Sequence, residues 1–236
     1  MATRDREAPP PALTAYLLEG LDDQPLAEEL ATWLGERRFR AFVHSNREKI
    51  RKKLRTAADA EGRRDVRLEL LAARLLLADR RMELTFEPYG ARGGPDFRVS
   101  IAGQAPFNLE VTRLRARADE TRVGAQLLAK LRQLPPSVAN AVLIGVEGMT
   151  PDSVDLDAIV RGIRARADAK EETFFVGRGF ESSRGFYQRF LRLGGAVIFN
   201  EMASGTGHAR LWANPSARIP LPSQVARVAA ELARHR

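Results

Sequence analysis

The chain has 236 residues, of which 44% are hydrophobic, and it contains no cysteine. It can therefore build a sizeable core, but it cannot use disulfides, thiolate metal sites or cysteine nucleophiles. Its formal net charge is +8, from 38 Lys and Arg against 30 Asp and Glu. This balance favours polyanionic partners, with nucleic acid first, although a soluble arginine-rich protein without such a partner would have the same composition.

Nothing in the sequence predicts a membrane location. No apolar run approaches the roughly 20 residues that a spanning helix needs. The charged N-terminal residues also lack the apolar core of a signal peptide. We therefore expect a cytoplasmic protein.

The N-terminal quarter is expected to be helical behind a disordered tail. Residues 1–12 are charged and proline-rich, which is typical of disorder. Apolar residues then recur at helical spacing over residues 13–62. A single helix over residues 36–60 would carry the densest cationic run of the chain. This run is either a solvated face or a surface that lies along a phosphate backbone. The candidate nucleic-acid-binding residues in it are Arg47, Lys49, Arg51, Lys52 and Lys53.

A helix rich in Leu and Ala is predicted over residues 65–79, and Glu69 falls on its apolar side. Carboxylates are seldom buried without a partner. One interpretation pairs Glu69 with Arg67 or Arg74. The other, which we favour, makes Glu69 an inward-facing carboxylate that reaches a site on the strands that follow.

Three short strands are predicted next, as an antiparallel meander. The first spans residues 82–87, Asp96 opens the second, and the third spans residues 107–112 after a turn. Polar and apolar residues alternate in the third strand, so that Glu110 lies on its polar face. Asp96 and Glu110 can therefore converge, and two carboxylates suit a hard cation such as Mg²⁺.

A crossover connection is predicted after the meander. The helix over residues 120–134 places Gln126 and Lys130 on one face, because they are four residues apart. The apolar run 140–146 then predicts a strand buried on both faces and parallel to its neighbour. Beyond it the pattern predicts helices near 153–163 and 186–193, strands at 195–199 and 209–212, and a last helix over 223–233.

This order of elements resembles the PD-(D/E)XK superfamily, the restriction-endonuclease-like fold. Glu69 lies on the helix, Pro95-Asp96 on the second strand and Glu110-Val111-Thr112 on the third. The resemblance covers about residues 63–150. It implies an α/β fold of the mixed-sheet α+β kind, with an αβββαβ core. It also implies Mg²⁺- or Mn²⁺-dependent hydrolysis of nucleic-acid phosphodiester bonds. We expect DNA as the substrate rather than RNA. The expected divisions are a tail over 1–12, a helical region over 13–62 and a restriction-endonuclease-like domain over 63–236, whose core is 63–150 and whose C-terminal extension is 151–236.

The resemblance also implies roles for individual residues. Asp96 and Glu110 would bind the metal, with Glu69 as a possible third ligand and the main-chain carbonyl of Val111 facing the ion. The lysine of the family motif is replaced by Thr112, which can hold a water molecule but supplies no charge.

Lys130 is the best replacement for the missing lysine. Together, Gln126 and Lys130 resemble the Gln-x-x-x-Tyr/Lys helix motif of the exonuclease-type branch of the superfamily. Arg113 and Arg115 would hold the nucleic-acid backbone together with the cationic helix. The alternative hypothesis is a catalytically inactive relative that binds nucleic acid or a protein partner.

Overall fold

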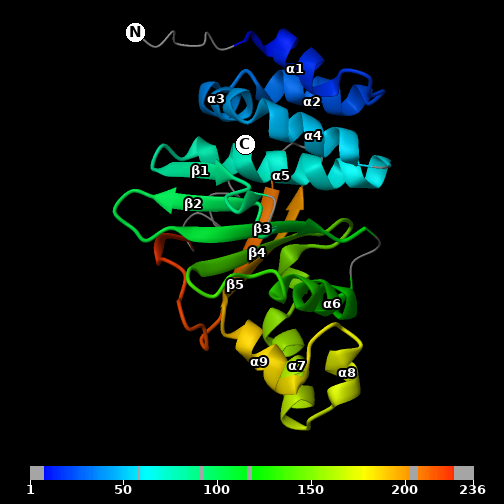
Figure 1. Ribbon diagram of the computed structural model, residues 1–236, viewed down its shortest axis with the longest axis vertical. Helices are drawn as coiled ribbons and strands as arrows, with labels where there is room; N and C mark the ends of the chain where they lie inside the picture. Colours follow the sequence, from blue (N-terminus) through cyan, green and yellow to red (C-terminus); the bar gives the residue numbers. More distant parts are fainter. Residues whose placement is uncertain (1–7, 58, 91–92, 116–118, 202–206, 226–236) are drawn as a thin grey trace. The chain divides into compact units, whose positions relative to one another are not determined.

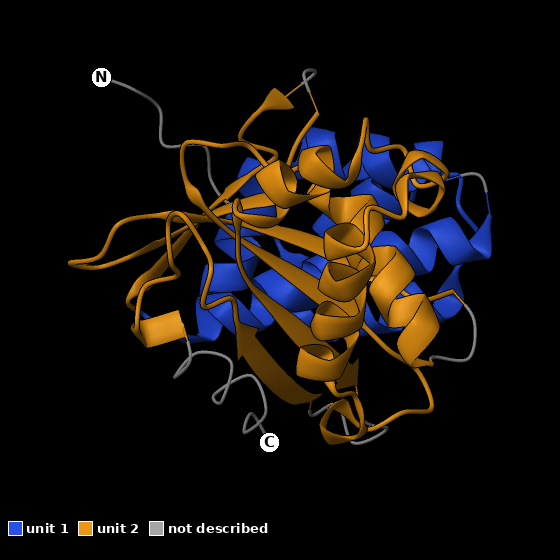
Figure 2. Cartoon of the chain, turned by 90° about the horizontal axis from the view of Figure 1, so that it is seen from below, with its two compact units in different colours: residues 1–80 blue, residues 81–236 orange. Residues whose placement is uncertain are grey.

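The computed structural model describes residues 8–57, 59–90, 93–115, 119–201 and 207–225 (Figure 1). The chain divides into two compact units, residues 1–80 and 81–236, which are coloured separately in Figure 2. No helix of the described residues is long and apolar enough to cross a bilayer.

The first unit is entirely helical in its described part. Its helices are α1 (Pro10–Leu18), α2 (Gln24–Trp33), α3 (Arg37–Ser45), α4 (Arg47–Thr56) and α5 (Ala60–Ala78). The expected tail over 1–12 is wrong at its end, because α1 already begins at Pro10. Prolines are tolerated in a first helical turn, where backbone N–H groups have no helical acceptor. The rest of the expected tail, residues 1–7, lies outside the described residues.

The single helix expected over 36–60 is two helices, α3 and α4, separated at Asn46. The Asn46 side chain donates from Nδ2 to the carbonyl oxygen of Phe42 at 2.8 Å. Asn side chains compete in this way with the main-chain hydrogen bonds that would extend a helix. Ile50 and Leu54 are the buried residues of α4, whereas Lys49, Lys52 and Arg55 are exposed.

Helix α5 falls in the first unit, whereas the sequence grouped it with the strands that follow. It packs against α3 and α4, and Leu70 and Ala73 are among its buried residues. The boundary between the units therefore lies at residues 80 and 81 rather than at 62 and 63.

The second unit contains a mixed six-stranded sheet whose strands lie in chain order. β1 (Met82–Phe86), β2 (Phe97–Ile101) and β3 (Phe107–Arg113) form the predicted antiparallel meander. β4 (Ala139–Gly145) lies parallel to β3, and β5 (Leu193–Glu201) lies parallel to β4. β6 (Gly207–Ala213) closes the order antiparallel to β5. The α/β class with a mixed sheet is thus confirmed.

Four helices complete the described part of this unit and lie together in Figure 1. They are α6 (Glu120–Leu131), α7 (Leu156–Asp168), α8 (Glu172–Val176) and α9 (Ser183–Phe190). A 3₁₀ turn, η2 (Pro151–Ser153), lies just before α7. The crossover predicted between the third and fourth strands is confirmed, and α6 provides it. The helix expected over 186–193 ends instead at Phe190, and Leu193 begins β5. The helix expected over 223–233 lies mostly outside the described residues.

The core of the second unit lies between α6–α9 and the even-numbered residues of β4 and β5. Val142 and Ile144 of β4 contribute to it, as does Ile198 of β5. Phe175 is fully buried in it, and its ring lies 5.0 Å from that of Phe186. This apolar layer holds α6 against the sheet.

Candidate functional site

Polar side chains gather on one face of β2 and β3. Arg98 pairs with Asn108 across the two strands, and Phe97 pairs with Leu109. Asp96, one residue earlier, therefore lies at the level of Glu110. Because side chains alternate between the faces of a sheet, Asp96 and Arg98 share a face with Asn108 and Glu110.

Helix α6 places its two predicted residues on this face. The Nζ atom of Lys130 lies 2.6 Å from Oε1 of Glu110. One turn earlier, Nε2 of Gln126 donates to Oγ1 of Thr112. The helix begins where the Asp119 side chain accepts a hydrogen bond from its first turn, at the N–H of residue 122. Residues four apart on a helix and two apart on a strand are separated by similar distances. Gln126 and Lys130 can therefore reach Thr112 and Glu110 at the same time.

Glu110 is buried, with 3% of its surface exposed, although the sequence placed it on a polar face. A buried carboxylate is costly unless it is paired and hydrogen-bonded. Lys130 supplies an opposite charge from α6, and its side chain is 19% exposed. The positive charge that Thr112 does not carry is therefore present at the strand, on a side chain from the neighbouring helix.

Asp96 is held in place by the main chain around it. Its Oδ2 accepts a hydrogen bond of 2.8 Å from the N–H of Val111, and its carbonyl accepts one of 2.7 Å from the N–H of Glu87. Gly94, two residues before Asp96, has a φ of +140°, and a Cβ at this position would lie 2.9 Å from Cδ2 of Tyr89. The turn before Asp96 therefore needs glycine for both its backbone angle and its close approach to the ring.

The carboxylate oxygens of Asp96 and Glu110 are of the chemical type that binds a hard cation. Carboxylate oxygens are the ligands that Mg²⁺ prefers, and the ion often takes one or two of them together with water and phosphate oxygens. In the described part of the chain, no group of three or more Asp, Glu or His residues could hold a metal. Two carboxylates alone would leave coordination positions for water and phosphate oxygens. The role of the Val111 carbonyl stays a prediction.

Glu69 has a partner within the first unit. Its Oε2 lies 2.5 Å from Nζ of Lys53. The arginines considered as partners bind elsewhere, Arg67 to Glu29 and Arg74 to Glu36. The role of Glu69 as a third metal ligand stays a prediction.

Several cations of the predicted nucleic-acid-binding run are engaged within the first unit. Arg51 binds Glu19, and its guanidinium lies 4.4 Å from the ring centroid of Tyr16. Lys53 binds a buried carboxylate of α5, and Arg47 donates to a main-chain carbonyl at 3.1 Å. Among the five cations of this run, Lys49 and Lys52 are exposed. These contacts favour the solvated, ion-paired interpretation for much of α4.

Arg113 is not available at the surface as expected. Its side chain is only 6% exposed, and Nη1 lies 3.0 Å from Oε1 of Glu147. Arg113 ends β3 on the face opposite to Thr112, as the alternation predicts. Arg115, two residues later, is exposed.

Arg98 was not among the predicted site residues. It lies two residues after Asp96, so the same alternation that selected Glu110 places it beside the acidic pair. Its Nε atom is buried and makes no hydrogen bond. The alternation of β2 was therefore the signal that could have identified it.

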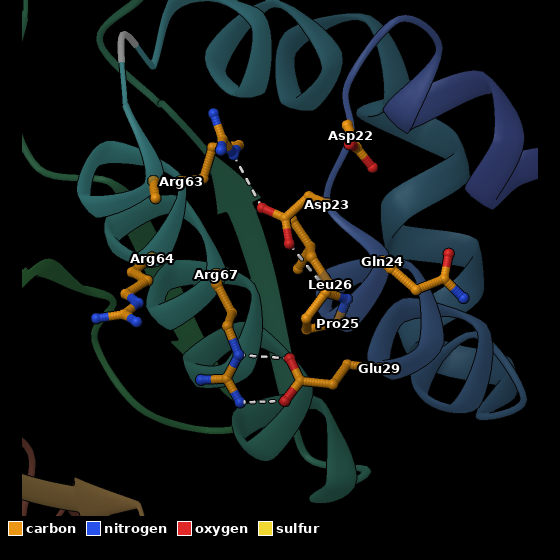
Figure 3. Close-up of a pocket in the computed structure, with 10 residues that line it drawn as sticks. Asp22, Asp23, Gln24, Pro25, Leu26, Glu29, Arg63, Arg64 and Arg67 are labelled. Carbon is orange, nitrogen blue, oxygen red and sulfur yellow. Dashed lines mark hydrogen bonds and ion pairs between the residues drawn. The ribbon is translucent and has the colours of Figure 1, made fainter.

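A pocket in the first unit is lined by arginines of α5 and acidic residues near α2 (Figure 3). Nε of Arg63 lies 2.8 Å from Oδ2 of Asp23, and Nη2 of Arg67 lies 2.6 Å from Oε1 of Glu29. Arg64, on the rim, pairs with a glutamate of its own helix. Each of these guanidinium groups already has a carboxylate partner, so we do not assign the pocket to an anionic ligand.

The chain matches no protein-family model, no curated protein and no solved structure.

Proposed function

We propose that the chain is a metal-dependent nuclease with a restriction-endonuclease-like core. The observation that carries this proposal is the contact of 2.6 Å between Lys130 and Glu110. It brings an amine from α6 to a carboxylate beside Asp96, and this combination suits phosphodiester hydrolysis. The antiparallel meander, the α6 crossover and the parallel β4 also support the proposed core.

In this proposal Asp96 and Glu110 hold Mg²⁺ or Mn²⁺. When bound, such an ion polarises a phosphoryl oxygen and lowers the pKa of a coordinated water molecule. Lys130 stabilises the negative charge that develops on the phosphoryl group. Gln126 holds the Thr112 hydroxyl in a fixed orientation, from which it can position a water molecule.

The expected substrate is a nucleic acid bound mainly through its phosphates. The net charge of +8 favours a polyanion, and exposed cations such as Lys52 and Arg115 can contact a backbone. Such contacts carry little sequence information, so we expect weak sequence preference and strong salt dependence. DNA remains the favoured substrate over RNA.

A second candidate function is nucleic-acid binding without cleavage. Thr112 carries no charge, and Lys130 already neutralises Glu110 in the described structure. No cluster of three acidic residues able to hold a metal occurs among the described residues. This function predicts salt-sensitive binding and no fragments with any metal.

The two functions are separated by a cleavage assay on single- and double-stranded DNA and RNA, with Mg²⁺, Mn²⁺ or EDTA. Asp96→Asn is the preferred variant, because an amide oxygen can still accept from the N–H of Val111. If the site is catalytic, Asp96→Asn and Glu110→Gln lower the rate by about 100-fold or more. Glu181→Gln, at an exposed position of the same unit, serves as the matched control and cuts like the wild type. Binding without metal-dependent fragments would establish the second function instead.

A further inference from the structure

Arg98 is the second residue of β2, beside the proposed metal site. Its cross-strand partners are Thr85 on β1 and Asn108 on β3. It is two residues from Asp96, which corresponds to roughly 7 Å along a strand. The guanidinium therefore belongs to the same face as the two carboxylates.

The bonding state of Arg98 is unusual for a partly buried arginine. Its Nε atom is buried without a hydrogen-bond acceptor, and Oδ1 of Asn108 is buried without a donor. Among the described residues, no carboxylate pairs with Arg98. Buried polar atoms almost always have partners, so the unpaired Nε shows that the protein does not fully satisfy this guanidinium. The side chain is only half-buried, which leaves the rest of the guanidinium open to a ligand.

The other cation of the face is differently placed. Lys130 is bound to Glu110, whereas Arg98 has no acid to neutralise it in the described structure. Thr85 is exposed and Ser100 half-buried, and by strand alternation both hydroxyl groups share the face of Arg98. A guanidinium with neighbouring hydroxyl donors suits an anion with several acceptor oxygens.

Phosphate meets this description, because its oxygens accept two parallel N–H bonds from one guanidinium. We propose that Arg98 binds a phosphate group of the nucleic acid at the Asp96/Glu110 site. The proposal rests on the nucleic-acid function assigned above, and it makes Arg98 a substrate-binding residue. Arg98 would then supply a positive charge that no carboxylate of the described structure neutralises, whereas Thr112 supplies none.

Binding of a fluorescein-labelled DNA oligonucleotide to the full chain tests this role. Measurement in EDTA excludes cleavage, and a series of KCl concentrations gives the salt dependence. Arg98→Gln is expected to weaken binding on the order of tenfold. It should also lower the slope of log K against log[salt] by about one phosphate contact. Arg98→Lys should restore the slope, because it keeps the charge.

Arg184→Gln is the matched control, because it removes the same charge from an exposed position on α9. It should change neither affinity nor slope. Thermal unfolding shows whether each variant is folded. If Arg98→Gln does not fold, Arg98→Met, which keeps the apolar stem, gives the same comparison.

The outcomes separate this inference from the proposed nuclease activity. Asp96-dependent cleavage together with wild-type binding and wild-type KM in Arg98→Gln would overturn the role of Arg98 and leave the activity standing. Loss of binding in Arg98→Gln without any cleavage by the wild type would support the role and refute the activity. A wild-type chain that binds no nucleic acid would refute both.

Discussion

Replacement of Lys130 by methionine removes the amine that faces Glu110 while it keeps an apolar stem of similar length. The carboxylate is buried and loses an ion pair of 2.6 Å. Removal of one partner from a buried pair typically costs 3–5 kcal/mol of unfolding free energy. The Lys130 side chain is 19% exposed, so water weakens the pair, and we expect a cost of about 3 kcal/mol.

Urea unfolding with tryptophan fluorescence measures this cost in the second unit alone. The chain has two tryptophans, and in a Trp33→Phe background only Trp212 on β6 reports. With a urea dependence of about 2 kcal/mol per M, the midpoint should fall by about 1.5 M. Glu110→Gln in the Lys130→Met background should recover much of the loss, because a neutral amide needs no cation.

The control for this cycle is Lys170→Met, which removes an exposed lysine that follows α7. It should shift the midpoint by less than about 0.3 M, because surface substitutions rarely exceed about 0.5 kcal/mol. Equal midpoints for the wild type and Lys130→Met would refute the claim that this amine stabilises the buried carboxylate. The claim would also be refuted if the changes in unfolding free energy caused by Lys130→Met and by Glu110→Gln simply added up in the double variant.

Three further predictions concern the second unit. Phe175→Ala should lower the free energy of unfolding by about 3–5 kcal/mol, because it empties a fully buried site. Val176→Ala, at a residue that is 56% exposed, should change it by less than about 0.5 kcal/mol. Equal effects of the two substitutions in urea unfolding would contradict the described core. The hydrogen bond from the Ser183 hydroxyl, followed by that from its N–H, lowers the pKa of Glu172 below its ordinary value of 4.5, so this contribution to stability is present above pH 4.5 and lost as the pH falls through the folded value. Ser183→Ala should therefore show a smaller fall in Tm between pH 6 and pH 3 than the wild type, and parallel curves would exclude the contribution. Gly195→Ala should destabilise the unit by about 1–3 kcal/mol in the same urea assay, because its Cβ would lie 2.6 Å from a main-chain oxygen of β6; an unchanged midpoint would contradict this close approach.

The elements around the candidate site could be predicted because their signals are local. Alternation along β3 placed Glu110 on a polar face, and the four-residue spacing on α6 placed Gln126 and Lys130 on one helix face. The resemblance to the superfamily implied that this helix face meets the strand, and Lys130 does contact Glu110. The crossover followed from a helix that precedes an apolar strand. The pairing of the first three strands needed only the rule that neighbouring elements pair.

Features that depend on distant partners were not predictable in this way. Arg113 appeared to be a surface cation, but it is buried against Glu147, 34 residues later in the chain. The division of the 36–60 helix depends on how the Asn46 side chain bonds to the main chain, and sequence spacing does not reveal that choice. Alternation along β2 places Arg98 on the face of Asp96, but the positive charge of the site was expected from residues that follow Glu110 in the chain.

A crystal structure of the wild type grown with Mn²⁺ tests the central claim most directly. Anomalous scattering at the manganese edge locates the ion without reliance on activity. We predict a peak in contact with the carboxylates of Asp96 and Glu110, with the Lys130 ammonium beside it and no peak in Asp96→Asn. No peak at these carboxylates, with Lys130 still bound to Glu110, would contradict the proposed metal-dependent chemistry.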